Sequence, residues 1–207
     1  MPSLTESLLS VHARNQVLFP PLCFALVLPG VYRSGHPNKM NLEHMDSLRL
    51  KSIMYLSTDD YRHDTRTWAL DRGLNIFHYR TDVSKDPTIE VNEDLIAEAL
   101  EEVLDVRNHP ILIHDNKGRL LPSIISALLR LLTGWTLDAA LTEYRMFLPP
   151  ADNWVPEKER EGKPKKDKER IADIQPIDLP FAAQFIEHFP LERLTYDPQH
   201  APSWLKR

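Results

Sequence analysis

Glycine, cysteine and long apolar runs are all scarce in this sequence. It has 6 glycines among 207 residues, against 17 prolines, and no repeat of fixed period, which excludes collagen-like and solenoid folds and Gly-rich linkers. The one cysteine, Cys23, cannot form an internal disulfide and indicates a reducing compartment, so we expect a cytoplasmic protein. The longest apolar stretch, residues 124–132, is interrupted by Ser126 and Arg130 and is too short to span a bilayer.

A strong charge of one sign is also absent. The formal net charge of −5 is mild and of the wrong sign for a nucleic-acid coat, so we expect no nucleic-acid partner. The first residues include Glu6 and no long apolar core, so we expect neither a secretory signal nor a membrane partner.

Strand-like runs alternate with helical patterns along the chain, and its 42% apolar and 27% charged residues are ordinary for one globular domain. The expected strands are residues 23–28, 31–34, 52–56, 75–79 and 111–114. Helices are expected after Asn41, from Arg62, from Asn92 to Val106, from Pro122 to Gly134, from Thr136 to Phe147, and near residues 179–189. This alternation predicts an α/β fold with a central, mostly parallel sheet of about four to five strands flanked by helices.

Composition divides the chain into five segments. We expect an N-terminal arm (1–19), a main domain (20–148), a charged insertion (149–178), a helix that docks on the domain (179–190) and a tail (191–207). Within the insertion, residues 156–170 hold twelve charged residues and no aliphatic one, so we expect a solvated, disordered stretch. A regulatory or nucleic-acid contact is the alternative, which its mixed signs weaken.

The segment with the clearest chemical meaning is the buried strand 111–114 and the loop that follows it. A buried strand, a short loop and a helix bring backbone N–H groups of the loop and the helix N-terminus towards one point, which is the geometry of an anion site. A second distinctive string, GVYRSG, covers residues 30–35.

Together these strings resemble the plant and fungal atypical dual-specificity phosphatases of the cysteine-phosphatase superfamily, a group that includes inositol-pyrophosphate phosphatases. Residues 104–118 match that family's LDVRNHP-x-LIH-x-NKG run almost letter for letter, and residues 20–24 and 48–56 match earlier strings. Later matches are Trp135, Glu143, Tyr144, Phe147 and the Phe-Ile-Glu at 185–187. The resemblance implies a cysteine-phosphatase-like fold.

The resemblance also implies where the chemistry would lie. In active members the loop reads HC-x₅-R, whose cysteine attacks phosphorus and whose arginine binds the phosphoryl oxygens. Here Asp115 stands at the cysteine position and Leu121 at the arginine position. The remnant of the phosphate loop is His114, Asp115, Asn116, Lys117, Gly118 and Arg119. The resemblance places Asp82 and Asp86 in the loop that supplies a general acid.

From the two replacements we predict a catalytically inactive protein that is a regulatory or scaffolding subunit in a hetero-oligomer with related family proteins. We expect Asp115 to accept the loop's own N–H bonds, so that inositol phosphates bind weakly. An active phosphatase on inositol pyrophosphates or phosphoproteins and a non-hydrolysing phosphate sensor are the alternatives. A nucleophilic Asp115 would need a metal or several cations, and Lys117 and Arg119 are the cations near it in sequence.

Neither a cofactor nor a metal site is expected. The nine histidines include no pair spaced i,i+4 on one helix, and a single cysteine supplies no thiolate cluster.

Overall fold

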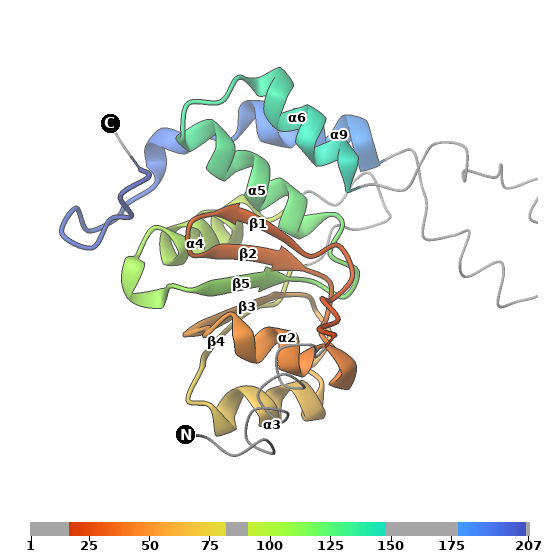
Figure 1. Cartoon of the computed structure of the whole chain (residues 1–207). Coiled ribbons are helices and arrows are strands. Elements are labelled where there is room, and N and C mark those ends of the chain that lie inside the picture. Colours follow the sequence, from red (N-terminus) through yellow and green to blue (C-terminus); the bar gives the residue numbers. More distant parts are fainter. Residues whose placement is uncertain (1–16, 82–90, 148–177, 206–207) are drawn as a thin grey trace, which may run out of the picture.

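Five strands form one sheet in the order β1-β2-β5-β3-β4. The computed structural model describes residues 17–81, 91–147 and 178–205. β1 (Ala25–Leu28) pairs antiparallel with β2 (Val31–Ser34), while β5 (Ile111–His114), β3 (Ser52–Leu56) and β4 (Asn75–Tyr79) continue the sheet in parallel. The predicted α/β fold with a mostly parallel sheet flanked by helices is confirmed (Figure 1).

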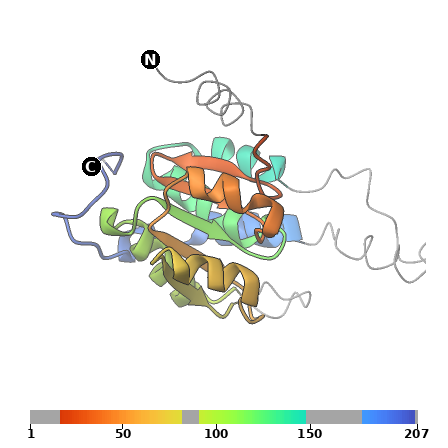
Figure 2. The same cartoon turned by 60° about the horizontal axis from the view of Figure 1, so that its bottom comes forward.

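Helices cover both faces of this sheet. α2 (Leu42–Ser47) and α3 (His63–Asp71) lie on one face, which Figure 2 turns towards the viewer. α4 (Glu93–Val103) and α5 (Leu121–Leu132) lie on the other, with α6 (Leu137–Met146) and α9 (Asp178–His188) packed against α5 (Figure 1). The short 3₁₀ helices are η1 (Lys39–Asn41), η2 (Val106–Asn108) and η4 (Leu191–Arg193).

The core is split by the sheet into two layers, as the alternation of side chains along β5 shows. Ile111 and Ile113 point into the larger layer under α4 and α5, whereas Leu112 joins Trp68 and Met45 in the smaller one. A parallel strand with apolar side chains on both faces indicates a sheet covered on both sides, and β5 is the central strand of this one. This burial fixes the point at which the following loop leaves the sheet.

Three local predictions need correction. Asn41 does not cap α2 with its side chain, because its amide group bonds instead to the backbone of Asn38, Phe19 and Pro20. The helix from Asn92 ends at Val103, since residues 106–108 form η2. Cys23 precedes β1 rather than lying on it, is half-buried and has a φ of 54°.

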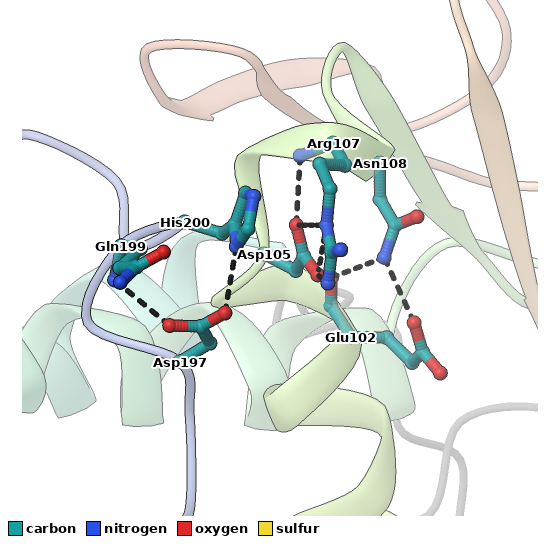
Figure 3. A network of polar contacts seen from close by, with 7 residues as sticks. All are labelled: Glu102, Asp105, Arg107, Asn108, Asp197, Gln199 and His200. Carbon is teal, nitrogen blue, oxygen red and sulfur yellow. Dashed lines mark hydrogen bonds and ion pairs between the residues drawn. The ribbon is translucent and has the colours of Figure 1, made fainter.

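The C-terminal segment returns to the main body. Leu194 is buried, the Val106 N–H donates to the carbonyl of His200 (2.9 Å), and Trp204 Nε1 donates to the carbonyl of Pro29 (3.2 Å). Figure 3 shows the polar contacts on either side of this return: Asp105 with Arg107 and Glu102 with Asn108 around η2, and Asp197 with Gln199 and His200 in the C-terminal segment. The predicted arm, the charged stretch 156–170 and the exact segment limits lie largely outside the described residues and stay predictions. Among the described residues no helix is long and apolar enough to cross a membrane.

Candidate active site

The loop between β5 and α5 lies at the carboxyl end of the central strand, where parallel sheets commonly bind ligands. It is held very close to the end of β2. Gly118 has a φ of 75°, and a Cβ built on it would lie 2.3 Å from the nitrogen of Gly35. A side chain at position 118 would therefore push the loop away from β2. The glycine keeps the two backbones in contact and sets the loop's shape.

Asp115 occupies the centre of this loop. Its Oδ1 accepts the N–H of Lys117 (2.8 Å) and the N–H of Gly118. Burial raises the pKa of the carboxyl, and these N–H groups, Arg33 and the N–H of Leu121 act in the opposite direction. Asp115 therefore accepts the loop's own N–H groups, as we expected from the sequence.

Asn116 joins the loop to the segment that follows β3. Its Oδ1 accepts the hydroxyl of Tyr55 (2.8 Å), while its Nδ2 donates to Asp59 (2.7 Å) and to Ser57 (3.3 Å). The main-chain carbonyl of Asn116 accepts the N–H of His36 (3.4 Å). The loop is therefore fixed from two neighbouring strands rather than by its own residues alone.

His114, the last residue of β5, belongs to an aromatic cluster formed by His36, Tyr55, Tyr61, His78 and His114, in which Tyr55 contacts the other four rings. Its ring centroid lies 5.0 Å from those of His36 and Tyr55 and 5.5 Å from that of Tyr61. Its Nε2 lies 3.2 Å from the Tyr61 hydroxyl, and its Nδ1 lies 3.3 Å from the carbonyl of Asp115. Complete burial lowers the pKa of His114 to about 3, so the ring is neutral and supports the loop structurally.

Arg33 lies behind the loop, on β2. Its Nη2 donates to the Gly118 carbonyl (2.5 Å) and to Ser123 Oγ (2.7 Å), and its guanidinium carbon lies 3.7 Å from the centre of the Phe147 ring. Burial lowers the pKa of this arginine to about 10, which leaves it charged at neutral pH. A buried positive charge thus faces the underside of the loop that holds Asp115.

The other predicted site residues are spread over different environments. Lys117 is exposed and Arg119 is partly buried, while the Leu121 side chain is packed in the core at the start of α5. Asp82 and Asp86, the general-acid candidates, lie outside the described residues. Among those that are described, no three His, Cys, Asp or Glu side chains group as ligands for a metal ion.

Sequence reasoning missed the supporting residues Tyr55, Tyr61, His36 and His78, and noted Arg33 only as part of the GVYRSG string at residues 30–35. A usable signal was present, since His36, Tyr55 and His78 lie at or just beyond the carboxyl ends of predicted strands. Such positions meet at one edge of a parallel sheet. Tyr61 had no comparable signal, because it lies in the irregular segment between β3 and α3.

The chain is similar to known phosphatases over most of its length. A model described as "Tyrosine phosphatase family" matches residues 18–158, which is more than half of the chain. The chain belongs to the tyrosine phosphatase family. A family relative from Oryza sativa subsp. japonica, "Inositol diphosphatase DSP1", is 35% identical over 178 residues, which cover 86% of this chain and 72% of that protein. A second, from Dictyostelium discoideum, is named "Probable tyrosine-protein phosphatase DG1060"; it is 29% identical over 90% of this chain and 95% of its own.

Solved structures of the family agree with the fold. The catalytic core of Siw14 superposes with a TM-score of 0.68 at 27% identity, covering 86% of this chain and 93% of that one. A related structure shows that Siw14 is a PP-IP phosphatase from S. cerevisiae. The predicted family and its cysteine-phosphatase-like fold are therefore confirmed.

The prediction of a catalytically inactive regulatory or scaffolding protein is contradicted by these relatives. The proteins that match most of the chain are named as phosphatases, and the similar solved structure is a catalytic core. We therefore withdraw that prediction, and with it the expectation that the chain is not an enzyme. The hetero-oligomer with related proteins stays a prediction, as does the assignment of Asp115 and Leu121 to the cysteine and arginine positions.

Proposed function

We propose that this protein is a phosphatase that hydrolyses inositol pyrophosphates, with Asp115 as its nucleophile. The observation that carries the proposal is the convergence of the Lys117 and Gly118 N–H groups on a carboxylate at the end of β5. This loop lies within the segment that the family model matches, and the names of relatives such as the rice inositol diphosphatase support the substrate class. A cytoplasmic location, expected from the unpaired cysteine, is part of the same proposal.

The chemistry would proceed in two displacements. A carboxylate oxygen of Asp115 attacks the terminal phosphorus of the diphosphate, the anhydride P–O bond breaks, and the inositol phosphate leaves with the bonding electrons. Water then attacks the phosphorus of the acyl phosphate, which releases inorganic phosphate, regenerates the carboxylate and returns a proton to solvent. The leaving group is a phosphate, which is much less basic than an alkoxide, so its departure depends little on a general acid.

The main obstacle is repulsion between a carboxylate and a polyanionic substrate. Lys117 and Arg119 on the loop and Arg33 behind it supply compensating positive charge. Asp115 must also give up its own hydrogen bonds from the loop before a phosphoryl group can take them, and each bond to a charged group is worth roughly 1.5–3 kcal/mol. We therefore expect slow turnover compared with a thiolate nucleophile.

The test is phosphate release from a purified inositol pyrophosphate by the wild-type protein and by Asp115→Asn, which keeps the shape of the side chain and removes its charge. We expect release by the wild type and a loss of at least about a hundredfold in the variant, since a nucleophile has no substitute. Substrate labelled on its terminal phosphate should leave label on the wild-type protein that hydroxylamine removes, as acyl phosphates require.

Asp105→Asn is the matched control, because Asp105 also accepts a backbone N–H within its own loop, from Arg107 (2.8 Å), but lies at the opposite end of β5. It should release phosphate at the wild-type rate. Equal release by wild type and Asp115→Asn would overturn the role of Asp115. Binding of the inositol pyrophosphate with no release by the wild type would overturn hydrolysis and leave a phosphate sensor.

A further inference from the structure

Arg33 is almost completely buried, but its hydrogen bonds do not compensate for the loss of solvation of its guanidinium. It is 1% exposed, and its Nε and Nη1 groups have no acceptor among the described residues. An unsatisfied buried donor is destabilising, and more so when it belongs to a charged group. Natural structures contain few such groups, so this one requires an explanation other than stability.

The contacts that Arg33 does make are concentrated on the anion loop. Its Nη2 group donates to the carbonyl oxygen of Gly118 and to Ser123 Oγ, and Ser123 Oγ in turn donates to the carbonyl oxygen of Arg119. Two consecutive carbonyl groups of the loop are thus held by side chains. The ring of Phe147 covers the guanidinium at 3.7 Å and keeps it in this position.

Holding a carbonyl also fixes the N–H of the same peptide unit. In a planar trans peptide the C=O and the following N–H point in opposite directions, so the bond from Arg33 to Gly118 turns the Arg119 N–H away from Arg33. Without that bond the Gly118–Arg119 peptide could turn over and present a carbonyl oxygen, which repels an anion, on the side where its N–H now lies.

We propose that Arg33 is a positioning residue for the anion loop: it holds the Gly118 carbonyl from behind and keeps the loop N–H groups available for a phosphoryl group. Its positive charge acts in the same direction, because it faces a loop that must accept phosphate beside the Asp115 carboxylate. The proposal rests on the proposed phosphatase function for its activity readout alone.

Arg33→Lys is the decisive variant, because both bonds come from Nη2 at the tip of the guanidinium, and a lysine side chain, one bond shorter, keeps the charge but does not place its nitrogen at that point. We expect amide hydrogen exchange of residues 117–120 to rise at least about tenfold while exchange within α5 stays at its wild-type value. With an inositol pyrophosphate as substrate, kcat should fall at least about tenfold and KM should rise.

Arg130→Lys is the matched control. Arg130 is also a largely buried arginine, paired with Glu143 (2.6 and 2.9 Å) and stacked on Trp135, but these contacts lie on α6 and in the turn before it. It should leave loop exchange, kcat and KM unchanged. Unchanged loop exchange in Arg33→Lys would overturn the proposal whether or not the wild type is active, and unchanged kinetics would overturn its catalytic relevance.

Ser123→Ala provides a second route if Arg33→Lys does not fold. It removes one acceptor of Arg33 and the donor to the Arg119 carbonyl, so loop exchange and KM should change in the same direction by a smaller factor. Wild-type loop exchange in Ser123→Ala would contradict the proposed support of consecutive carbonyl groups. Because exchange is measured on the free protein, failure of the positioning role is distinguishable from failure of the phosphatase function.

Discussion

At the carboxyl end of β5, Asp115 lies among loop N–H groups above the buried Arg33, whereas before its amino end Asp105 pairs with Arg107 at the surface (Figure 3). A histidine also lies near each of these aspartates. His114 is completely buried against aromatic rings, while His200 pairs with Asp197 (2.7 Å) and remains partly exposed. The same residue types therefore occur in opposite environments at the two ends of one strand.

This difference in environment distinguishes a candidate active site, at the carboxyl end of β5, from a structural attachment of the C-terminal segment near its amino end. The surface group, which consists of Asp105, Arg107, Asp197 and His200, has its charges paired and partly exposed. Such pairs contribute little to stability but help to hold the C-terminal segment. Near the carboxyl end lie Arg33, with two donors that find no acceptor among the residues described, a carboxyl with a raised pKa at Asp115 and a histidine that stays neutral. Titratable groups with shifted pKa values cluster at functional sites, where the arrangement of side chains serves function rather than stability.

The largest expected effect is the loss of the loop by Gly118→Ala. The new Cβ would meet the Gly35 nitrogen and the Ser34 carbonyl carbon at 2.3 and 2.6 Å, in a backbone conformation that alanine disfavours. We expect the free energy of unfolding to fall by about 3 kcal/mol or more, with phosphate release abolished. Urea denaturation and phosphate release would measure both.

Gly73→Ala is the control that distinguishes backbone strain from steric overlap. Gly73 also has a positive φ, of 68°, but nothing lies within 4 Å of its added Cβ. This variant should lose about 1 kcal/mol and retain activity. If the two substitutions were equally mild, the loop would not depend on its contact with β2, and the contrast between the two ends of β5 would weaken.

Much of the fold could be predicted because hydrophobic pattern and turn residues determine it. The predicted strands 31–34, 52–56, 75–79 and 111–114 are the observed ones, since short runs rich in β-branched, aromatic and other apolar residues lie between turn residues and helical patterns. The position of the anion loop followed from the same pattern. The partners of Asn116 and of Arg33 did not, because they depend on which strands become neighbours, and β5 is inserted between β2 and β3.

The second effect, smaller than that of Gly118→Ala, is a loss of stability at acidic pH. The pKa of His114 falls from 6.5 to about 3 on folding because burial excludes its charged form, so the unfolded chain binds the extra proton between these values. The stability that neutral His114 provides is complete above pH 6.5 and is lost as the pH falls towards 3. The free energy of unfolding should decrease by about 2 kcal/mol between pH 7 and pH 5.

Denaturation by urea at pH 7 and pH 5 would measure this slope in the wild type, in His114→Gln and in His200→Gln. The slope should become shallower in His114→Gln, although burial also lowers the pKa values of His36, His44 and His109, which contribute a remainder. The surface exchange His200→Gln should leave it unchanged. A wild-type slope in His114→Gln would show that the buried ring is not the source of the acid sensitivity.

The smallest effect is expected at the surface group, from Asp197→Asn. The hydrogen bond from His200 holds the pKa of Asp197 below 3.8, so this contact is intact above that pH and is lost only as the pH falls further. Acid should therefore loosen the aromatic cluster before it breaks the contact between Asp197 and His200. Because the pair is exposed, the substitution should lower the melting temperature by no more than about 2 °C and leave phosphate release unchanged.

Amide hydrogen exchange of the wild-type protein at pH 5 should show faster exchange around His114 while residues 194–200 keep their pH 7 protection. Earlier loss of protection in residues 194–200 would reverse the assignment of the two ends, since the paired surface group would then be the acid-sensitive one.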